Sequence, residues 1–130
     1  HRKTKTSPLL AKTSELALTN TVMEIEGNSI ALRKREGAGP GLVWIGGYRS
    51  DMNGTKAAHL DGFAAKTGRS FLRHDYSGHG QSSGALHEGT ISLWVNQSLN
   101  VFRSQSSGPQ ILIGSSMGGW IALRMAQVLL

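Results

Sequence analysis

A short apolar run that ends in a glycine-flanked serine constrains the fold of this chain more than any other feature. Residues 110–113 are Gln-Ile-Leu-Ile, Gly114-Ser115-Ser116-Met117-Gly118 follows, and an apolar helical pattern continues to the last residue. Glycine has no Cβ atom, so it suits positions where a strand and a helix approach closely. The pattern predicts a strand over Gln110–Gly114 and a helix over Met117–Leu130, joined by a tight turn with Ser116 at its apex. We call residues 114–118 the serine turn.

Hydrophobic periodicity upstream of the serine turn predicts four more strands and two more helices. The predicted strands are Thr21–Glu26, Ser29–Lys34, Gly41–Ile45 and Ser70–Asp75, and the predicted helices are Thr55–Thr67 and a helix capped by Thr90 that runs through Phe102. The first two strands alternate apolar and polar residues around a turn at Gly27-Asn28, which is typical of an antiparallel hairpin. The alternation of strands and helices that follows indicates parallel strands. The expected fold class is therefore α/β, a β-hairpin followed by a parallel βαβαβα unit.

The remaining segments complete the organisation expected for the chain. Residues 1–20 are predicted to be a flexible basic lead-in, residues 21–130 one domain, and residues 36–40 a loop. The helix at 55–67 is expected to bury an alanine-rich side. That side comprises Ala57, Ala58, Leu60, Ala64 and Ala65.

The positive charge of the chain does not indicate nucleic-acid binding. The net charge of the 130 residues is +6, but Arg2, Lys3, Lys5 and Lys12 precede the first acid, so residues 15–130 carry only +2. No basic stripe interleaved with aromatic residues follows, as a nucleic-acid surface would require. The chain has no cysteine and no apolar stretch long enough to span a bilayer. These features favour a cytoplasmic protein, with the mitochondrial matrix as the alternative because the start is basic and poor in acids.

Ser116 is the candidate nucleophile. A serine at the start of a helix can attack a carbonyl while free N–H groups stabilise the oxyanion that develops. One such donor is expected from the backbone of Met117 and a second from Tyr48, which follows Gly46-Gly47 after the predicted strand 41–45. Two alternatives stay open for residues 46–48: a tight turn without a ligand, or a Tyr48 side chain offered to the acyl group.

Asp75 ends a predicted strand and is followed by Gly78, Gly80 and Ser82 in a compact loop. We expect an architectural role for Asp75, which can accept hydrogen bonds from backbone N–H groups near the serine turn. The glycine spacing does not match a dinucleotide-binding motif, so no cofactor is predicted. His74, His79 and His87 lie near Asp75, but their spacing matches no zinc motif, so no metal site is predicted either.

Three motifs in this order resemble those of the α/β-hydrolase superfamily. They are Ile45-Gly46-Gly47-Tyr48, the Asp75-x-x-Gly78-x-Gly80-x-Ser82 loop and Gly114-x-Ser116-x-Gly118-Gly119. Longer strings are similar to the branch that holds the mitochondrial palmitoyl-protein thioesterase and acyl-glucuronide esterase with their bacterial relatives. Those strings are Gly47-Tyr48-x-Ser50-x-Met52-Asn53-Gly54-Thr55-Lys56-Ala57, Asp75-Tyr76-Ser77-Gly78 and residues 108–116.

The resemblance implies a serine hydrolase that cleaves a small carboxylic ester or thioester, or an acylated protein, through an acyl-enzyme on Ser116. In that fold the acid and the histidine of the triad follow the serine in chain order. We therefore expect them after residue 130, with this chain forming the N-terminal half and inactive alone. A catalytically inactive α/β-hydrolase-like binding domain is the alternative, and the oligomeric state stays open.

Overall fold

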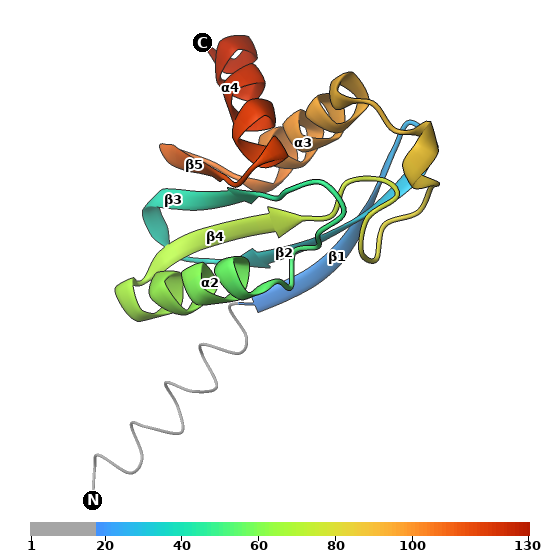
Figure 1. The fold of residues 1–130 in the computed structure, drawn as a ribbon. Coiled ribbons are helices and arrows are strands. Elements are labelled where there is room, and N and C mark those ends of the chain that lie inside the picture. The colour runs from blue at the N-terminus through green and yellow to red at the C-terminus, as the bar shows by residue number, and fades with distance from the viewer. Residues whose placement is uncertain (1–17) are drawn as a thin grey trace, which may run out of the picture.

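The computed structural model describes residues 18–130 as five strands, three α-helices and a short 3₁₀-helix. In chain order they are β1 (Leu18–Ile25), β2 (Asn28–Arg35), β3 (Ala38–Ile45), α2 (Thr55–Thr67), β4 (Arg69–His74), η1 (Leu86–Glu88), α3 (Ile91–Gln105), β5 (Gln110–Gly114) and α4 (Met117–Leu129). Figure 1 shows these elements along the chain. The expected fold class, a hairpin followed by alternating strands and helices, is confirmed.

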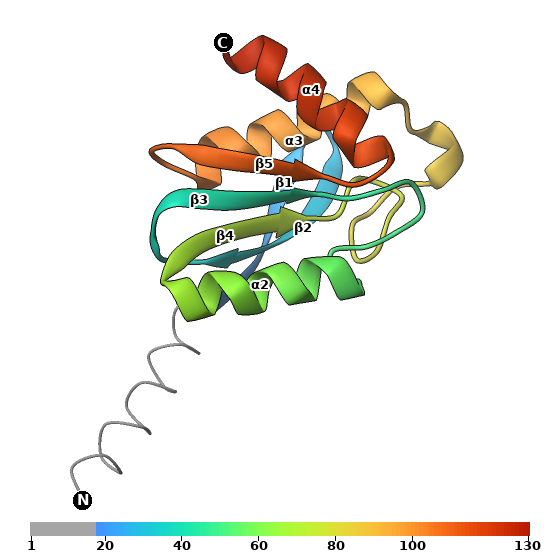
Figure 2. The same cartoon turned by 60° about the vertical axis from the view of Figure 1, so that its left-hand side comes forward.

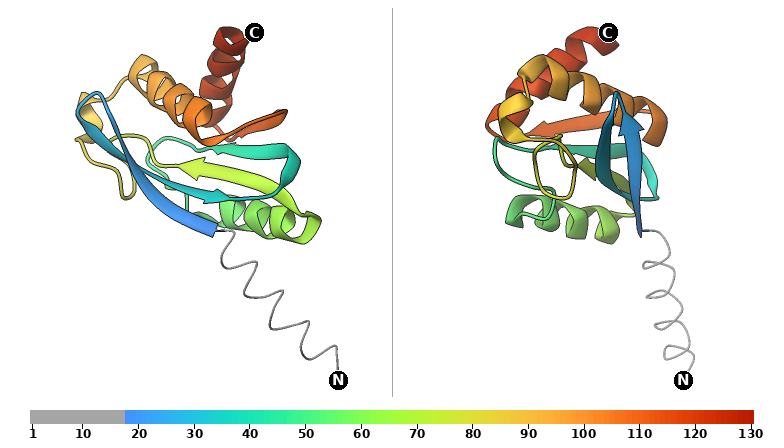
Figure 3. Two further views of the ribbon diagram at one scale, coloured as in Figure 1. Left: turned by 180° about the vertical axis from the view of Figure 1, so that it is seen from behind. Right: turned by 90° about the vertical axis from the view of Figure 1, so that its right-hand side faces the viewer.

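All five strands form one mixed sheet in the order β1-β2-β4-β3-β5. β1 and β2 pair antiparallel through a turn at Glu26-Gly27, where both residues have positive φ (47° and 86°), as a two-residue type I′ hairpin requires. β2 pairs antiparallel with β4, whereas β3 runs parallel to both β4 and β5. The carboxyl ends of β3, β4 and β5 consequently lie at the same end of the sheet. The β1-β2 hairpin lies on the side of the sheet away from β5 (Figure 3).

Helices cover both faces of the sheet, with α2 on one face and α3 and α4 on the other (Figure 2). Because side chains alternate along a strand, β3 supplies both cores. Val43 and Ile45 pack into the larger core, which also holds residues of α3 and α4. Leu42 and Trp44 pack into the smaller core with Ala57 and Ala64 of α2. The central strands are therefore buried on both sides.

Element boundaries follow the sequence predictions to within three residues. Three of the differences affect the hairpin and β3. β1 begins at Leu18 rather than Thr21, so residues 18–20 belong to the hairpin, and the rest of the predicted lead-in lies outside the described residues. β3 begins at Ala38, so residues 38–40 of the predicted loop are strand, with a register shift against β4 between Ala38 and Leu42. The hairpin turn occupies Glu26-Gly27 instead of Gly27-Asn28.

The buried side of α2 differs from the alanine-rich side that the sequence predicts. Ala58 and Ala65 are exposed, whereas Asp61 is buried beside Ala57 and Ala64. Asp61 is accommodated there by two ion pairs, at 2.7 Å to Arg35 and 3.1 Å to Arg73. Burying a carboxylate is costly unless it is paired and hydrogen-bonded, so the partners on β2 and β4 allow a charged residue to join α2 to the sheet.

Candidate active site

The candidate site lies where β3, β4 and β5 end. Each of these parallel strands is followed by one of the three sequence motifs: residues 46–48 after β3, Asp75 after β4, and the serine turn after β5. In open α/β sheets, ligands bind outside the carboxyl ends of the strands. The fold thus brings together three segments that are far apart in sequence.

Ser116 has a strained backbone. Its φ is 57° and its ψ is −121°, a combination that residues with a side chain rarely adopt. The side chain is exposed, and Ser116 occupies the N-cap position of α4 without forming a side-chain capping bond. Met117 is the first residue of α4, so its N–H has no partner within the helix. The predicted positions of both residues, at the apex of the turn and at the start of the helix, are observed.

Gly118 and Gly114 make this close strand-to-helix turn possible. A Cβ on Gly118 would overlap the carbonyl group of Ile45 and come within 2.7 Å of the Gly46 oxygen. A Cβ on Gly114 would come within 2.6 Å of the Cα of Gly119. The backbone of α4 therefore rests directly on the end of β3, and the Ser115 N–H donates a 3.1 Å hydrogen bond to the Ile45 oxygen.

The turn after β3 lies against the serine turn. A Cβ built on Gly47 would be 3.6 Å from the Cβ of Ser116, so Gly47 and Ser116 are in direct apposition. The Gly47 oxygen accepts two hydrogen bonds, from the Ser50 hydroxyl at 2.8 Å and from the Ser50 N–H at 3.3 Å. Tyr48 follows with an exposed side chain, and it lines the same pocket as Ser116. Gly46, Gly47 and Tyr48 thus lie next to the serine turn.

Asp75 is buried and holds two loops. Its carboxylate accepts hydrogen bonds from the Met52 N–H at 2.7 Å and the Gln81 N–H at 2.9 Å. Burial raises the pKa of Asp75, and the bonds from Gln81 and Met52 oppose that shift. The partners of Asp75 belong to the loops after β3 and β4, and not to the serine turn itself.

An aromatic cluster lies beneath the turn after β3. Tyr76 packs edge-on against His74 and His79, with centroid distances of 5.2 Å in both cases, and lies 5.9 Å from Trp94. The Tyr48 ring lies over this cluster, 6.0 Å from His79 and 6.1 Å from Trp94. The Tyr76 hydroxyl donates a 2.7 Å hydrogen bond to the Gly46 oxygen. Burial raises the pKa of Tyr76, which keeps this donor protonated.

The pocket at Ser116 has a volume of about 420 Å³ and is lined by the turn after β3, the start of α2 and the serine turn. Its charged residues are Asp51 and Lys56, and the Lys56 ammonium lies 3.4 Å from the Ser115 hydroxyl. A neighbouring pocket of about 500 Å³ shares Trp44, Lys56 and Ser115 with it. Sequence reasoning missed Ser50, Lys56 and Tyr76 as site residues. The position of Tyr76, two residues after the end of the parallel strand β4, was the available signal.

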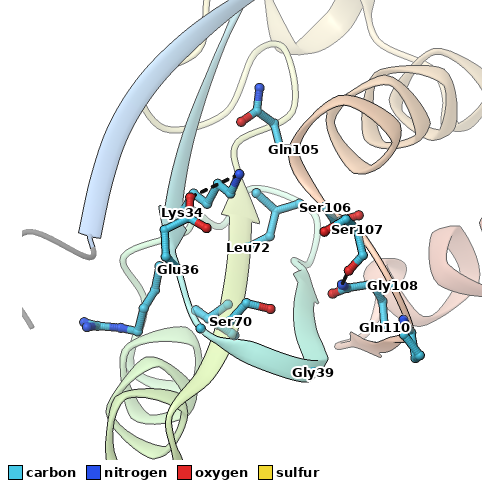
Figure 4. A pocket seen from close by; sticks show the side chains of 14 residues that line it. Lys34, Glu36, Gly39, Ser70, Leu72, Gln105, Ser106, Ser107, Gly108 and Gln110 are labelled. Carbon is cyan, nitrogen blue, oxygen red and sulfur yellow. Dashed lines mark hydrogen bonds and ion pairs between the residues drawn. The ribbon is translucent and has the colours of Figure 1, made fainter.

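A polar pocket of about 210 Å³ lies at the opposite end of the parallel strands, where β4 and β5 begin (Figure 4). Lys34 pairs with Glu36 at 3.2 Å, and the Gln110 side chain donates to the Ser107 oxygen. None of the predicted site residues lines this pocket.

Within residues 18–130, no three His, Asp or Glu side chains are grouped closely enough to hold a metal ion. His74 and His79 are buried, while His87 is exposed. None of the helices in this described part is both long and apolar enough to cross a membrane.

Comparison with known proteins agrees with this geometry. The family model described as "alpha/beta hydrolase fold" matches residues 54–129. Mitochondrial palmitoyl-protein thioesterase ABHD10 from Bos taurus is 42% identical over 98 residues, which cover 75% of this chain and 32% of that protein. The Homo sapiens protein is 43% identical with the same coverage. The chain spans about a third of the length of the curated relatives it matches.

Solved structures lead to the same family. Mouse α/β hydrolase domain-containing protein 10 superposes with a TM-score of 0.81 at 38% identity, over 85% of this chain and 44% of that one. A hydrolase structure from Agrobacterium vitis S4 gives a TM-score of 0.80 at 45% identity, over 86% of this chain and 46% of that one. The resemblance first noted in three short motifs thus extends through the sheet and its helices. The chain belongs to the α/β-hydrolase fold family.

Proposed function

We propose that the protein carrying this chain is a serine hydrolase that cleaves carboxylic esters or thioesters through an acyl-enzyme on Ser116. The observation that carries the proposal is the backbone of Ser116, whose φ of 57° and ψ of −121° hold an exposed hydroxyl at the start of α4. Strain of this kind persists only where the surrounding structure enforces it, and it concentrates at functional sites. The apposed Gly47 and the adjoining pocket support the same conclusion.

In the proposed reaction the Ser116 Oγ attacks the carbonyl carbon of the substrate. The Oγ–C bond forms, the carbonyl oxygen becomes an oxyanion, and the hydroxyl proton passes to a general base. The N–H groups of Tyr48 and Met117 stabilise the oxyanion. The C–O or C–S bond to the leaving group then breaks as the leaving group takes the proton, and water hydrolyses the acyl-enzyme.

A histidine is the proposed base and an acid orients it, as in other serine triads. Neither is assigned to a residue of this chain. Both belong to the part of a longer protein that follows Ser116 in chain order. The 130-residue chain alone is therefore proposed to be inactive, because a serine without a base is a weak nucleophile at neutral pH.

The proposed substrates are small acyl esters or thioesters, including acylated proteins, and the proposed site uses no cofactor and no metal. The thioester class is supported by relatives named palmitoyl-protein thioesterases. Those relatives are also named mitochondrial, which supports the mitochondrial alternative over the cytoplasmic location that the sequence favoured. Nucleic acid is not among the proposed partners.

Two measurements test the proposal. The intact protein is treated with a fluorophosphonate and its mass is measured, and hydrolysis of an activated acyl ester is measured on untreated protein. We expect one adduct on Ser116 in the parent protein, and neither adduct nor turnover in Ser116→Ala. Ser92→Ala is the matched control, since Ser92 is an exposed serine on α3. Undiminished hydrolysis by Ser116→Ala would refute the proposal. Ligand binding without turnover or adduct in the parent would favour the inactive binding domain instead.

A further inference from the structure

Two consecutive carbonyl oxygens of the turn after β3 are each held by a side-chain hydroxyl. The Gly46 oxygen accepts from Tyr76 at 2.7 Å, and the Gly47 oxygen accepts from Ser50 at 2.8 Å. These are the two peptide units that lead to the N–H of Tyr48. We propose that Tyr76 and Ser50 are positioning residues that orient the Tyr48 N–H toward the oxyanion; this inference rests on the proposed function.

Because the peptide unit is planar, the hydrogen bond from Ser50 to the Gly47 oxygen also determines the direction of the Tyr48 N–H. In a trans peptide the C=O and the following N–H point in opposite directions. The peptide that carries the Tyr48 N–H is the one whose carbonyl belongs to Gly47. Because Ser50 holds this oxygen through both its hydroxyl and its N–H, rotation of the peptide plane is blocked and the Tyr48 N–H keeps one direction.

Tyr76 holds the preceding peptide unit, Gly46–Gly47, through the hydrogen bond from its hydroxyl to the Gly46 oxygen. Its side chain is 2% exposed, and edge-on contacts with His74 and His79 hold its ring in place. The Gly46 oxygen that it binds also faces the Cα of Gly118, since a Cβ there would lie 2.7 Å from that oxygen. Tyr76 therefore sets the spacing between the turn after β3 and the serine turn, in which Met117 provides the other proposed donor.

Removal of either hydroxyl should affect the transition state more than substrate binding. Complete loss of an oxyanion donor lowers kcat by roughly 100- to 1,000-fold, and a donor that is present but misdirected costs less. We expect Ser50→Ala and Tyr76→Phe in the intact protein each to lower kcat by about 5- to 50-fold with KM nearly unchanged. Ser50→Thr keeps the hydroxyl and should recover most of the lost kcat.

A trifluoromethyl ketone provides a readout that a purely structural role would not change. Its carbonyl carbon accepts the Ser116 Oγ and its oxygen becomes an oxyanion, while the hydroxyl proton passes to the general base. We expect its inhibition constant to rise in Ser50→Ala and Tyr76→Phe by the same factor as kcat falls, since both report oxyanion binding. Ser104→Ala is the matched control, because this exposed hydroxyl also donates to a backbone carbonyl, that of Asn100, away from the site.

Three results separate the outcomes. Values of kcat within twofold of the parent in both variants, or losses confined to KM, would overturn the inference. If Tyr76→Phe does not fold, Ser50→Ala decides alone, since Ser50 is exposed and its loss leaves the core intact. Activity retained in Ser116→Ala would instead refute the proposed function, so the two failures are distinguishable.

Discussion

Gly118 shows how strictly a single position can be determined by its neighbours. Its Cα lies against the Ile45 carbonyl, and no side-chain movement can relieve a backbone overlap. We expect Gly118→Ala to lower the free energy of unfolding by about 3 kcal/mol or more. Chemical denaturation of the intact protein measures this.

Gly62 is the matched control, because it lies inside α2 with open space where its Cβ would be. Gly62→Ala should raise the free energy of unfolding by about 0.5–1 kcal/mol, since alanine loses less backbone entropy in a helix. Equal effects of the two substitutions would contradict the steric argument.

Residue-level prediction succeeded where one local pattern determines one conformation. The glycines of the serine turn and the Thr90 cap, which accepts a bond from the Leu93 N–H at 3.1 Å, are of this kind. Prediction failed where the partner is distant in sequence. The burial of Asp61 on α2 depends on Arg35 of β2 and Arg73 of β4, and nothing near Asp61 in the sequence indicates them. The hydrogen bond from Tyr76 to the Gly46 oxygen was missed for the same reason. The bond from Ser50 to the Gly47 oxygen is local, but it depends on a turn whose conformation the sequence pattern did not indicate.

At the level of elements, β4 and α3 are joined by a buried histidine. His74 on β4 lies 2.8 Å from the Ser98 hydroxyl on α3, and that hydroxyl donates to the Trp94 oxygen. His74 Nε2 is therefore the donor, and Nδ1 is buried with no hydrogen-bond partner among residues 18–130. Burial lowers the pKa of His74 to about 4. A charged ring in this place would carry a buried N–H with no acceptor.

This pKa predicts how stability changes with pH. The pKa of His74 in the folded state lies below its unfolded value of about 6.5. The neutral ring therefore makes its full contribution to the free energy of unfolding above pH 6.5. The contribution is lost as the pH falls toward 4, and it amounts to about 3 kcal/mol. Denaturation curves between pH 4 and 7 should show this loss in the parent protein, and a much smaller one in His74→Gln.

His59→Gln should retain the pH dependence of the parent, because His59 is an exposed residue on α2. A pH profile of His74→Gln that matches the parent would exclude His74 as the source.

Order and direction of the elements were predictable because each strand and helix has its own hydrophobic period. The helix bounds at 55–67 and the strand bounds at 110–114 match the sequence prediction. The strand order was not predicted, since β4 pairs with both β2 and β3 through contacts that no local period encodes. Residues 38–40, which extend β3 beyond the predicted strand, likewise depend on pairing with a neighbouring strand, through Ala38 and Arg69 of β4.

At the level of the whole molecule, exposed apolar side chains occur on the edge strand β5 and on α4. Trp120 and Leu123 of α4 are 65% and 61% exposed, and Ile111 of β5 is 44% exposed. A groove of about 830 Å³ between β5 and α4 includes Leu112 and Leu129. An unpaired edge strand beside apolar surface favours association between chains.

We expect a polypeptide of residues 18–130, expressed alone, to self-associate and to bind a hydrophobic dye. Ile111→Lys combined with Leu123→Lys should reduce both effects, because charged side chains block edge-to-edge pairing. Light scattering after size-exclusion chromatography measures the first effect and dye fluorescence the second. A monomeric parent polypeptide that binds no dye would contradict this prediction.

The two edges of the sheet differ, and under the proposed function this difference would link assembly of the sheet to activity. β1 ends one edge with a strand of mostly exposed residues, whereas β5 ends the other beside the groove and leads straight into Ser116. Any strand that pairs with β5 at this edge must lie close to Ser116, the proposed nucleophile. Acquisition of activity and the final step of assembly would then be one event. Two separately expressed fragments of such an enzyme would behave as a split reporter: each would be inactive alone, and activity would appear when they reassemble.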